Sequence, residues 1–241
     1  VGVQSVMVHS SLFNLLNHRS APYNIANKIK GFAMKIAILV TNTDTSPFAQ
    51  ARPLDGEKFT TLLAHHRPQW TFTIFDVKSD DFPRDITEFD GLMITGSPSS
   101  VNDPFPWIAT LLDLIRSAHS AKVPMFGACF GHQAIALALG GKIGKNPQGW
   151  QHGAIENHSV SRTPWGGMQP SFFLYGSHKE QVTTLPPNAE PIFTSTDCPF
   201  AGFQIGNHIF TSQHHPEMTP GFIRDLIEEY ATVLGPDITE R

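Results

Sequence analysis

The stretch that decides the fold is Val123-Pro-Met-Phe-Gly-Ala-Cys-Phe-Gly-His-Gln133. The apolar run 123–126 predicts a short strand, and the run 132–139 predicts a helix directly after it. The Gly-x-Cys-x-Gly turn between them is the thiol version of the nucleophile elbow, in which the glycines leave room for a sharp turn. We therefore predict that Cys129 stands above the edge of a sheet.

The position of Cys129 is suited to nucleophilic chemistry. A sulfur at a helix N-terminus is favoured as the reactive thiolate by the helix dipole. The N–H of the next residue, Phe130, can point at a developing oxyanion. A lone cysteine is more often a buried structural residue, but the two glycines, the strand and the helix favour the nucleophile.

Composition sets the broad class of protein. The 241 residues, of which 40% are hydrophobic and 16% charged, predict one α/β domain or at most two small ones. The net charge of −4 shows no basic excess for nucleic acid, and no apolar run reaches the length of about 18 residues that a transmembrane helix needs. We therefore expect neither nucleic acid nor membrane as a partner.

The chain has two cysteines, Cys129 and Cys198. A nucleophilic Cys129 must be free, so we expect no disulfide and a reducing, cytoplasmic compartment. Cys198 has no partner motif, which favours a small buried or turn residue.

Residues 1–33 contain no Asp or Glu, and the first acidic residue is Asp44. An acid-poor start with a weak amphipathic pattern over 3–18 is typical of an organelle transit peptide, but this one has a single arginine. The run Met34-Lys-Ile-Ala-Ile-Leu-Val40 instead resembles a natural start leading into a core strand. We expect 1–33 to be an N-terminal extension outside the catalytic fold, and 34–241 to be the catalytic domain.

Strands and helices alternate after residue 34. Strands are predicted at 36–41, 70–77, 91–95 and 123–126. Helices are predicted at 54–66, from Asp103-Pro104 onward, and after Cys129. This order predicts an α/β fold with a mostly parallel central sheet and helices on both faces.

The pattern changes after Gly141. Short β-type runs predict a small antiparallel addition, with a hairpin turn at Ile205-Gly-Asn-His208; they cover 154–160, 171–175, 191–195, 200–205 and 208–212. Thr219-Pro220 then predicts the start of a final helix, and Gly235-Pro236 its end.

The stretch Gln213-His214-His215-Pro216-Glu217 follows the last predicted strand. Glu217 can accept the imidazole N–H of His215, which would orient that ring as the base for a thiol. Neighbouring side chains on a strand face opposite sides, so only one of the two histidines can meet the sulfur. The spacing to Glu217 favours His215 over His214; for this stretch alone, a surface turn is an equal alternative.

The stretch Thr95-Gly96-Ser97-Pro98-Ser99 follows a strand at the carboxyl edge of the sheet, where α/β sites lie. A backbone N–H of Gly96 or Ser97 would complete an oxyanion hole with Phe130, although an ordinary loop has the same composition. The histidine-rich places lack a set of cysteine or carboxylate ligands, so no metal is expected; they are His65-His66, His132 and His214-His215.

Together, Gly-Ala-Cys129-Phe-Gly-His-Gln133 and Gln213-x-His215-Pro-Glu217 resemble the class I (triad) glutamine amidotransferase family over roughly 34–235. The resemblance implies a flavodoxin-like fold and a catalytic triad of Cys129, His215 and Glu217. It also implies an oxyanion hole near Gly96, Ser97 and Phe130, and a substrate contact at Gln133. Ser177-His178-Lys-Glu-Gln-Val182 resembles the loop beside the substrate, which makes His178 a second substrate-binding candidate. Gly96-Ser97-Pro98 departs from the usual Gly-Gly-Pro.

The stretch from Gly96 to Asp103 and Gly140-Gly-Lys-x-Gly144 resemble the stand-alone, GMP-synthetase-like branch of the family, which includes γ-glutamyl peptidases. The resemblance implies hydrolysis of glutamine through a γ-glutamyl thioester on Cys129, releasing glutamate and ammonia without a metal or organic cofactor. The ammonia would pass to a separate synthetase subunit.

Two alternatives to this function stay open, and a third is disfavoured. The first is a stand-alone γ-glutamyl peptidase or hydrolase that acts on γ-glutamyl conjugates. The second is a catalytically silent binding or regulatory protein. The third, a dienelactone-hydrolase-like thiol hydrolase, shares Gly-x-Cys-x-Gly but is disfavoured by the Gly131-His-Gln133 continuation and by Glu217.

Overall fold

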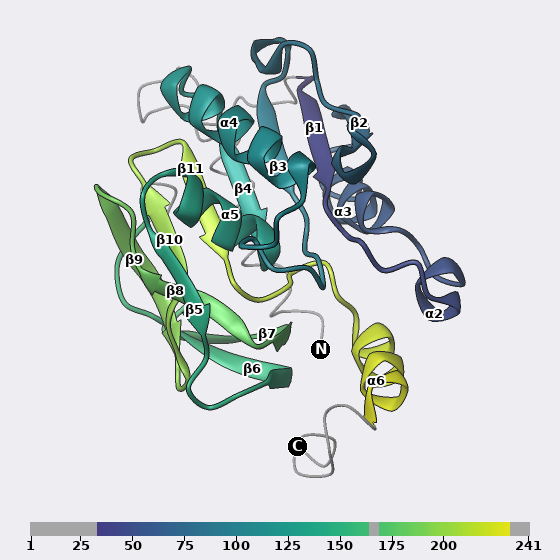
Figure 1. The fold of residues 1–241 in the computed structure, drawn as a ribbon, viewed down its shortest axis with the longest axis vertical. Helices are drawn as coiled ribbons and strands as arrows, with labels where there is room; N and C mark the ends of the chain where they lie inside the picture. The colour runs from purple at the N-terminus through teal and green to yellow at the C-terminus, as the bar shows by residue number, and fades with distance from the viewer. Residues whose placement is uncertain (1–32, 164–168, 232–241) are drawn as a thin grey trace.

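The computed structural model describes residues 33–163 and 169–231. Nine strands form one sheet in the order β2-β1-β3-β4-β11-β10-β9-β6-β7 (Figure 1). The first five are parallel to one another. They are β2 (Thr71–Asp76), β1 (Lys35–Val40), β3 (Gly91–Ile94), β4 (Met125–Ala128) and β11 (Ile209–Ser212). The α/β fold predicted from the strand–helix alternation is confirmed, because β1, β2, β3 and β4 follow one another in the chain through helical segments.

Four antiparallel strands continue the same sheet beyond β11. They are β10 (Cys198–Ile205), β9 (Ala189–Ser195), β6 (Gln151–Ser159) and β7 (Ser171–His178). Ile205 lies opposite Ile209, which confirms the predicted hairpin. A separate two-stranded sheet of β5 (Lys142–Lys145) and β8 (Glu180–Thr184) was not predicted; β8 follows β7 after a single residue, so the sequence offers no turn signal between them.

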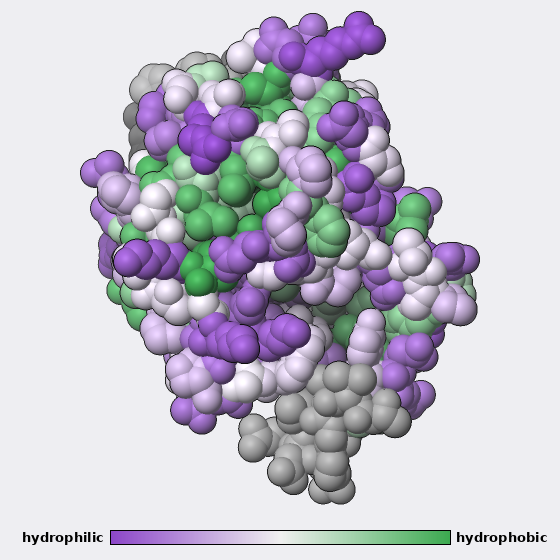
Figure 2. Space-filling model, viewed as in Figure 1, coloured by the Kyte–Doolittle hydropathy of each residue, from purple (hydrophilic) through white to green (hydrophobic). Residues whose placement is uncertain are grey.

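The two faces of the parallel half are covered by different helices, as the alternation along β1 requires. Ala37 and Leu39 point toward a core made with α4 (Pro106–Ser120) and α5 (Phe130–Ala138). Ile36 and Ile38 point the other way, into a core that includes Phe59 of α3 (Asp55–Ala64). Figure 2 shows hydrophobic side chains gathered among hydrophilic ones on the face over α4 and α5.

Two short helices from opposite ends of the chain lie side by side near the carboxyl edge of the sheet (Figure 1). They are α2 (Pro47–Gln50) and α6 (Pro220–Glu229). The rings of Phe48 and Phe222 are 5.9 Å apart, and Arg52 pairs with Asp225 at 2.8 Å. Two single-turn 3₁₀ helices, Val77–Ser79 and Ile86–Glu88, complete the structure.

The helix predicted to begin at Asp103-Pro104 begins at Pro106 instead, with Phe105 at the N-cap position. The carboxylate of Asp103 accepts the N–H of Ser100 and so caps the preceding turn rather than the helix. The final helix begins as predicted, because the hydroxyl of Thr219 accepts the N–H of Phe222 at 3.2 Å.

The predictions for the helix end at Gly235-Pro236 and for nearly all of the N-terminal extension, including the helix over 3–18, lie outside the described residues. Within the described ranges, no helix is long and apolar enough to cross a bilayer.

Candidate active site

Cys129 stands at the junction of β4 and α5 in a backbone conformation that L-residues rarely adopt, with φ 50° and ψ −103°. The turn is tight because its two glycines pack against backbone. A Cβ on Gly127 would lie 2.5 Å from the main chain of Gly131, and a Cβ on Gly131 would overlap the main-chain oxygen of Ile94. The N–H of Cys129 donates to the carbonyl of Ser212 at 2.8 Å, which ties the elbow to β11.

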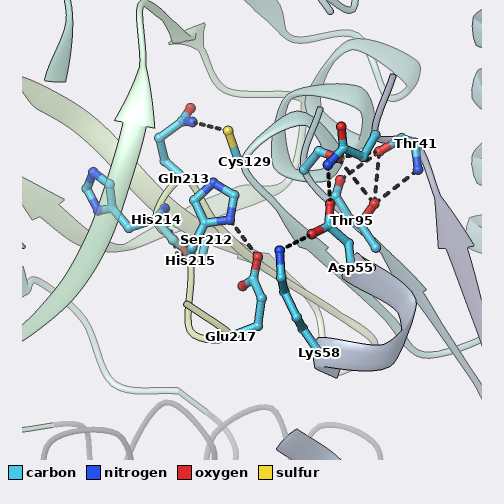
Figure 3. A network of polar contacts seen from close by, with 12 residues as sticks. Thr41, Asp55, Lys58, Thr95, Cys129, Ser212, Gln213, His214, His215 and Glu217 are labelled. Carbon is cyan, nitrogen blue, oxygen red and sulfur yellow. Dashed lines mark hydrogen bonds and ion pairs between the residues drawn. The ribbon is translucent and has the colours of Figure 1, made fainter. Parts of the chain in front are cut away.

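His215 and Glu217 lie together in the chain that leaves β11 (Figure 3). The Nδ1–H of His215 donates to Oε1 of Glu217 at 2.6 Å, and both side chains are buried. The N–H of His215 also donates to the carbonyl of Tyr175 at 2.7 Å, so the backbone that carries the ring is anchored to β7.

The charge of His215 is set by its two partners. Burial by itself lowers the pKa of this ring, but the charge of Glu217 and the charge and hydrogen bond of Cys129 outweigh it. The pKa of His215 is therefore raised well above its ordinary value. An imidazolium in contact with the sulfur is the arrangement that activates a thiol nucleophile.

His214 faces away from the sulfur. Its Nδ1 lies 2.8 Å from Oδ1 of Asn157, and its ring centroid lies 5.4 Å from that of His178. Burial, followed by the neighbouring histidines, holds the pKa of His214 well below its ordinary value. The structure thus brings His215, and not His214, to Cys129.

The loop at Gly96 and Ser97 packs directly against the imidazole. A Cβ on Gly96 would lie 2.7 Å from Cε1 of His215. The hydroxyl of Thr41 contacts the carbonyl oxygens of Thr95 and Gly96, each at 3.0 Å. Fixing these carbonyls also fixes the N–H groups of Gly96 and Ser97, which point the opposite way across each trans peptide.

The N–H of Phe130, in the first turn of α5, has no partner within the helix. Gly96 and Ser97 line the same cavity as Cys129, and Phe130 follows Cys129 directly, so the three predicted oxyanion residues lie near the sulfur.

Gln133 and His178, the two predicted substrate contacts, are both buried and bound within the protein. Nε2 of Gln133 donates to the carbonyl of Glu180 at 2.8 Å, and Nδ1 of His178 donates to the same oxygen at 3.1 Å. Neither residue lines the cavity that holds Cys129, whereas Ser177 does. The alternation along β7 explains the difference, since neighbours on a strand face opposite sides.

A cavity of about 560 Å³ extends from Cys129 and His215 toward α2, α3 and α6. Phe48 and Phe222 form part of its apolar wall. Lys58 pairs with Asp55 at 2.8 Å and lies 3.9 Å over the ring of Phe222. The ion pair of Asp55 and Lys58 in the cavity wall was not predicted from the sequence, although the i,i+3 spacing of the two residues is a signal for such a pair.

Gln213 was also missed as a site residue. Its side chain is fully buried, and its Nε2 lies 3.5 Å from Sγ of Cys129 (Figure 3). The available signal was its place two residues before His215, because alternate residues of an extended chain share a face.

Cys198, the second cysteine, is buried and free, and burial raises the pKa of its thiol to about 12. That thiol is held in its unreactive form. Among the residues that the structure describes, no three or more His, Cys, Asp or Glu side chains are grouped to hold a metal ion.

Several known proteins are similar to this chain. The family model for class-I glutamine amidotransferases matches residues 55–228. Gamma-glutamyl peptidase 3 of Arabidopsis thaliana is 29% identical over 180 residues, which make up 70% of this chain and 71% of that protein. The carbamoyl phosphate synthase small chain of Maricaulis maris is 35% identical over 137 residues, or 55% of this chain and 33% of that one.

A solved glutamine amido transferase from Methylobacillus flagellatus has a similar structure, with a TM-score of 0.65 at 25% identity; the match covers 84% of this chain and 76% of that one. Because the family model spans more than half of the chain, this protein belongs to the class I glutamine amidotransferases.

Proposed function

We propose that the protein hydrolyses γ-glutamyl amides, glutamine among them, with Cys129 as nucleophile, His215 as acid and base, and Glu217 as the residue that orients His215. The observation that supports this most is the buried ion pair of His215 and Glu217 at 2.6 Å, with the charge of Cys129 acting on the same ring. The elbow conformation of Cys129 adds to it.

In the first half of the reaction, the Cys129 thiolate attacks the γ-carbonyl carbon of the substrate and a C–S bond forms. The carbonyl oxygen becomes an oxyanion, for which the N–H groups of Phe130 and of Gly96 or Ser97 are the donors. The C–N bond then breaks as His215 gives its proton to the leaving amine. The products are a γ-glutamyl thioester and ammonia, or a larger amine.

In the second half, neutral His215 takes a proton from water as the water oxygen attacks the thioester carbon. The C–S bond breaks, glutamate leaves, and the thiolate with its imidazolium partner is restored. Glu217 accepts the Nδ1–H of His215 and stabilises the imidazolium whenever it forms. No step in this sequence calls on a metal or an organic cofactor.

The size of the cavity favours a second candidate function, cleavage of γ-glutamyl peptides or conjugates. A volume of about 560 Å³ is in the range that holds drug-sized ligands, which leaves room beyond a γ-glutamyl group for a large leaving amine. The likeness to gamma-glutamyl peptidase 3 supports the same function.

A panel of substrates tests both functions in one experiment. The purified chain is given glutamine and a set of γ-glutamyl dipeptides, and released glutamate is measured. The thioester on Cys129 is trapped and located by mass spectrometry. Faster turnover of dipeptides supports the peptidase, whereas a glutaminase rate that rises when a synthetase is added supports the amidotransferase subunit.

Cys129→Ala is expected to abolish glutamate release, while Cys198→Ala keeps most of it. Absence of turnover and of a trapped thioester with every substrate would instead support a silent binding or regulatory protein.

A separate synthetase as partner remains a prediction, supported by the likeness to the carbamoyl phosphate synthase small chain. We also propose a reducing, cytoplasmic location, because the Cys129 thiol is free and the proposed chemistry needs it reduced.

A further inference from the structure

Gln213 contacts the reacting sulfur, and a chain of hydrogen bonds behind it leads into the protein. Its Nε2 donates to Sγ of Cys129 at 3.5 Å, and its Oε1 accepts from Nε2 of Gln133 at 3.1 Å. Nε2 of Gln133 donates in turn to the carbonyl of Glu180 at 2.8 Å. Both glutamine side chains are buried, and the proposed triad does not use either of them.

The orientation of both amides follows from the far end of this chain of bonds. The carbonyl of Glu180 can only accept, so the atom of Gln133 that faces it is the NH₂ nitrogen. The same nitrogen faces Gln213, which must therefore present its oxygen. The remaining NH₂ group of Gln213 is left facing Cys129.

We propose that Gln213 is a catalytic residue that stabilises the Cys129 thiolate by donating an N–H hydrogen bond, and that Gln133 is a positioning residue that fixes the Gln213 amide. A thiol sulfur accepts hydrogen bonds weakly, whereas an ionised acceptor forms bonds about twice as strong as a neutral one. The donor therefore favours the thiolate over the thiol. This proposal rests on the proposed function only in taking Cys129 as the nucleophile.

The same bond acts at a second point of the reaction. In the thioester the sulfur carries no charge, so the Gln213 N–H gains little there. When the C–S bond breaks, negative charge returns to the sulfur, and a preorganised donor stabilises the leaving thiolate. Gln213 thus assists deacylation as well as acylation.

The test measures how fast iodoacetamide alkylates Cys129 as a function of pH, with the modified peptide identified by mass spectrometry. Gln213→Met keeps the length of the side chain and removes the donor. We expect the alkylation midpoint to rise by about one pH unit, the size of one hydrogen bond to a charged group. Gln133→Met keeps the donor and removes its anchor, so a smaller rise is expected.

Gln204→Met is the matched control. Gln204 is a buried glutamine on β10 whose Nε2 donates to Glu190 at 3.0 Å, and it does not line the cavity. Its alkylation profile is expected to equal that of the unchanged protein.

An unchanged midpoint in folded Gln213→Met overturns the proposal. If that variant does not fold, as judged by thermal unfolding, Gln133→Met decides: a raised midpoint supports the proposal and an unchanged one overturns it. If Gln133→Met raises KM for glutamine but leaves the profile unchanged, Gln133 is a substrate contact and its positioning role is wrong. Alkylation needs no substrate, so a failure to find γ-glutamyl turnover would not affect this result.

Discussion

His215 is the charged member of a group of four buried histidines that interact with one another. His132, His178 and His214 are held neutral, since burial lowers the pKa of His132 to about 3, that of His178 to about 4, and that of His214 well below its ordinary value. Only His215 has a carboxylate and a thiol beside it to outweigh burial. Neutral neighbours matter because a second buried cation would oppose the imidazolium.

His215→Asn is expected to slow glutamate release by about a hundredfold or more, as loss of a positioned acid and base does. It is also expected to raise the pH at which iodoacetamide alkylates Cys129, because the imidazolium that favours the thiolate is gone. Glu217→Gln is expected to give an intermediate loss, since it weakens the orientation of the ring without removing it.

His214→Asn is the matched variant at the neighbouring position, and its alkylation profile is expected to stay unchanged. A profile that shifts for His214→Asn and not for His215→Asn would reverse the two roles.

At the scale of elements, the site depends on close contact between the turns that follow β3, β4 and β11. The loop after β3 supplies Gly96, the elbow after β4 supplies Cys129, and the chain after β11 supplies His215. These three strands are neighbours in the order β3-β4-β11, so their carboxyl ends meet at one edge of the sheet. Any bulk added between the turns displaces a reacting group.

Gly96→Ala is expected to lower glutamate release by about tenfold or more, because small displacements of reacting groups cost large factors in rate. The reason is space rather than backbone conformation: Gly96 does not have a positive φ, but its Cβ would lie 2.7 Å from Cε1 of His215. Gly221→Ala in α6 is the control, since the nearest atom to its Cβ is 3.9 Å away. Equal rates for Gly96→Ala and Gly221→Ala would show that the loop can move aside.

At the scale of the whole molecule, the buried histidines link stability to pH. An unfolded histidine takes up its proton near pH 6.5, whereas folded His132 does so at about 3 and folded His178 at about 4. Their contribution to stability is therefore complete above pH 6.5 and is lost as the pH falls toward 4. His215 acts in the opposite direction, since its raised pKa gives a contribution that is lost as the pH rises through the folded value.

The free energy of unfolding, measured with urea, is expected to fall between pH 6.5 and 4 by about 1.4 kcal/mol per pH unit for each histidine held neutral. His132→Asn should reduce this slope, because one buried group no longer titrates. His158→Asn is the control, since the His158 side chain is 49% exposed. The linkage assigned to His132 is wrong if the two variants have the same slope.

A chain that begins at Met34 is expected to fold and to keep the reactivity of Cys129. The first strand, β1, begins at Lys35, and the backbone groups at its start are hydrogen-bonded to described residues. The carbonyl of Met34 accepts the N–H of Thr71 at 2.8 Å, and the N–H of Lys35 donates to the carboxylate of Asp90 at 3.0 Å. Thermal unfolding and iodoacetamide labelling would check this. A large fall in Tm together with lost labelling would show that residues 1–33 belong to the fold.

The sequence by itself determined the elbow, the choice of His215 over His214, and the alternating half of the sheet. These features follow from spacings of a few residues: glycines on each side of Cys129, a carboxylate two residues after His215, and apolar periods along single elements. Local sequence signals correctly predicted the helix start at Thr219. They misplaced the start of the helix that begins at Pro106, because Asp103 accepts the N–H of Ser100 instead of capping that helix.

Only the tertiary structure decided where Gln133, Gln213 and Lys58 lie. Gln133 and Gln213 are 80 residues apart in sequence and share a hydrogen bond because α5 and the end of β11 pack together. The cavity joins α2 and α3, from the start of the domain, to α6 near its end. The sequence order of β5 to β10 likewise did not reveal that β9 lies between β10 and β6. Such placements depend on contacts between distant segments, on which the periodicity of any one segment carries no information.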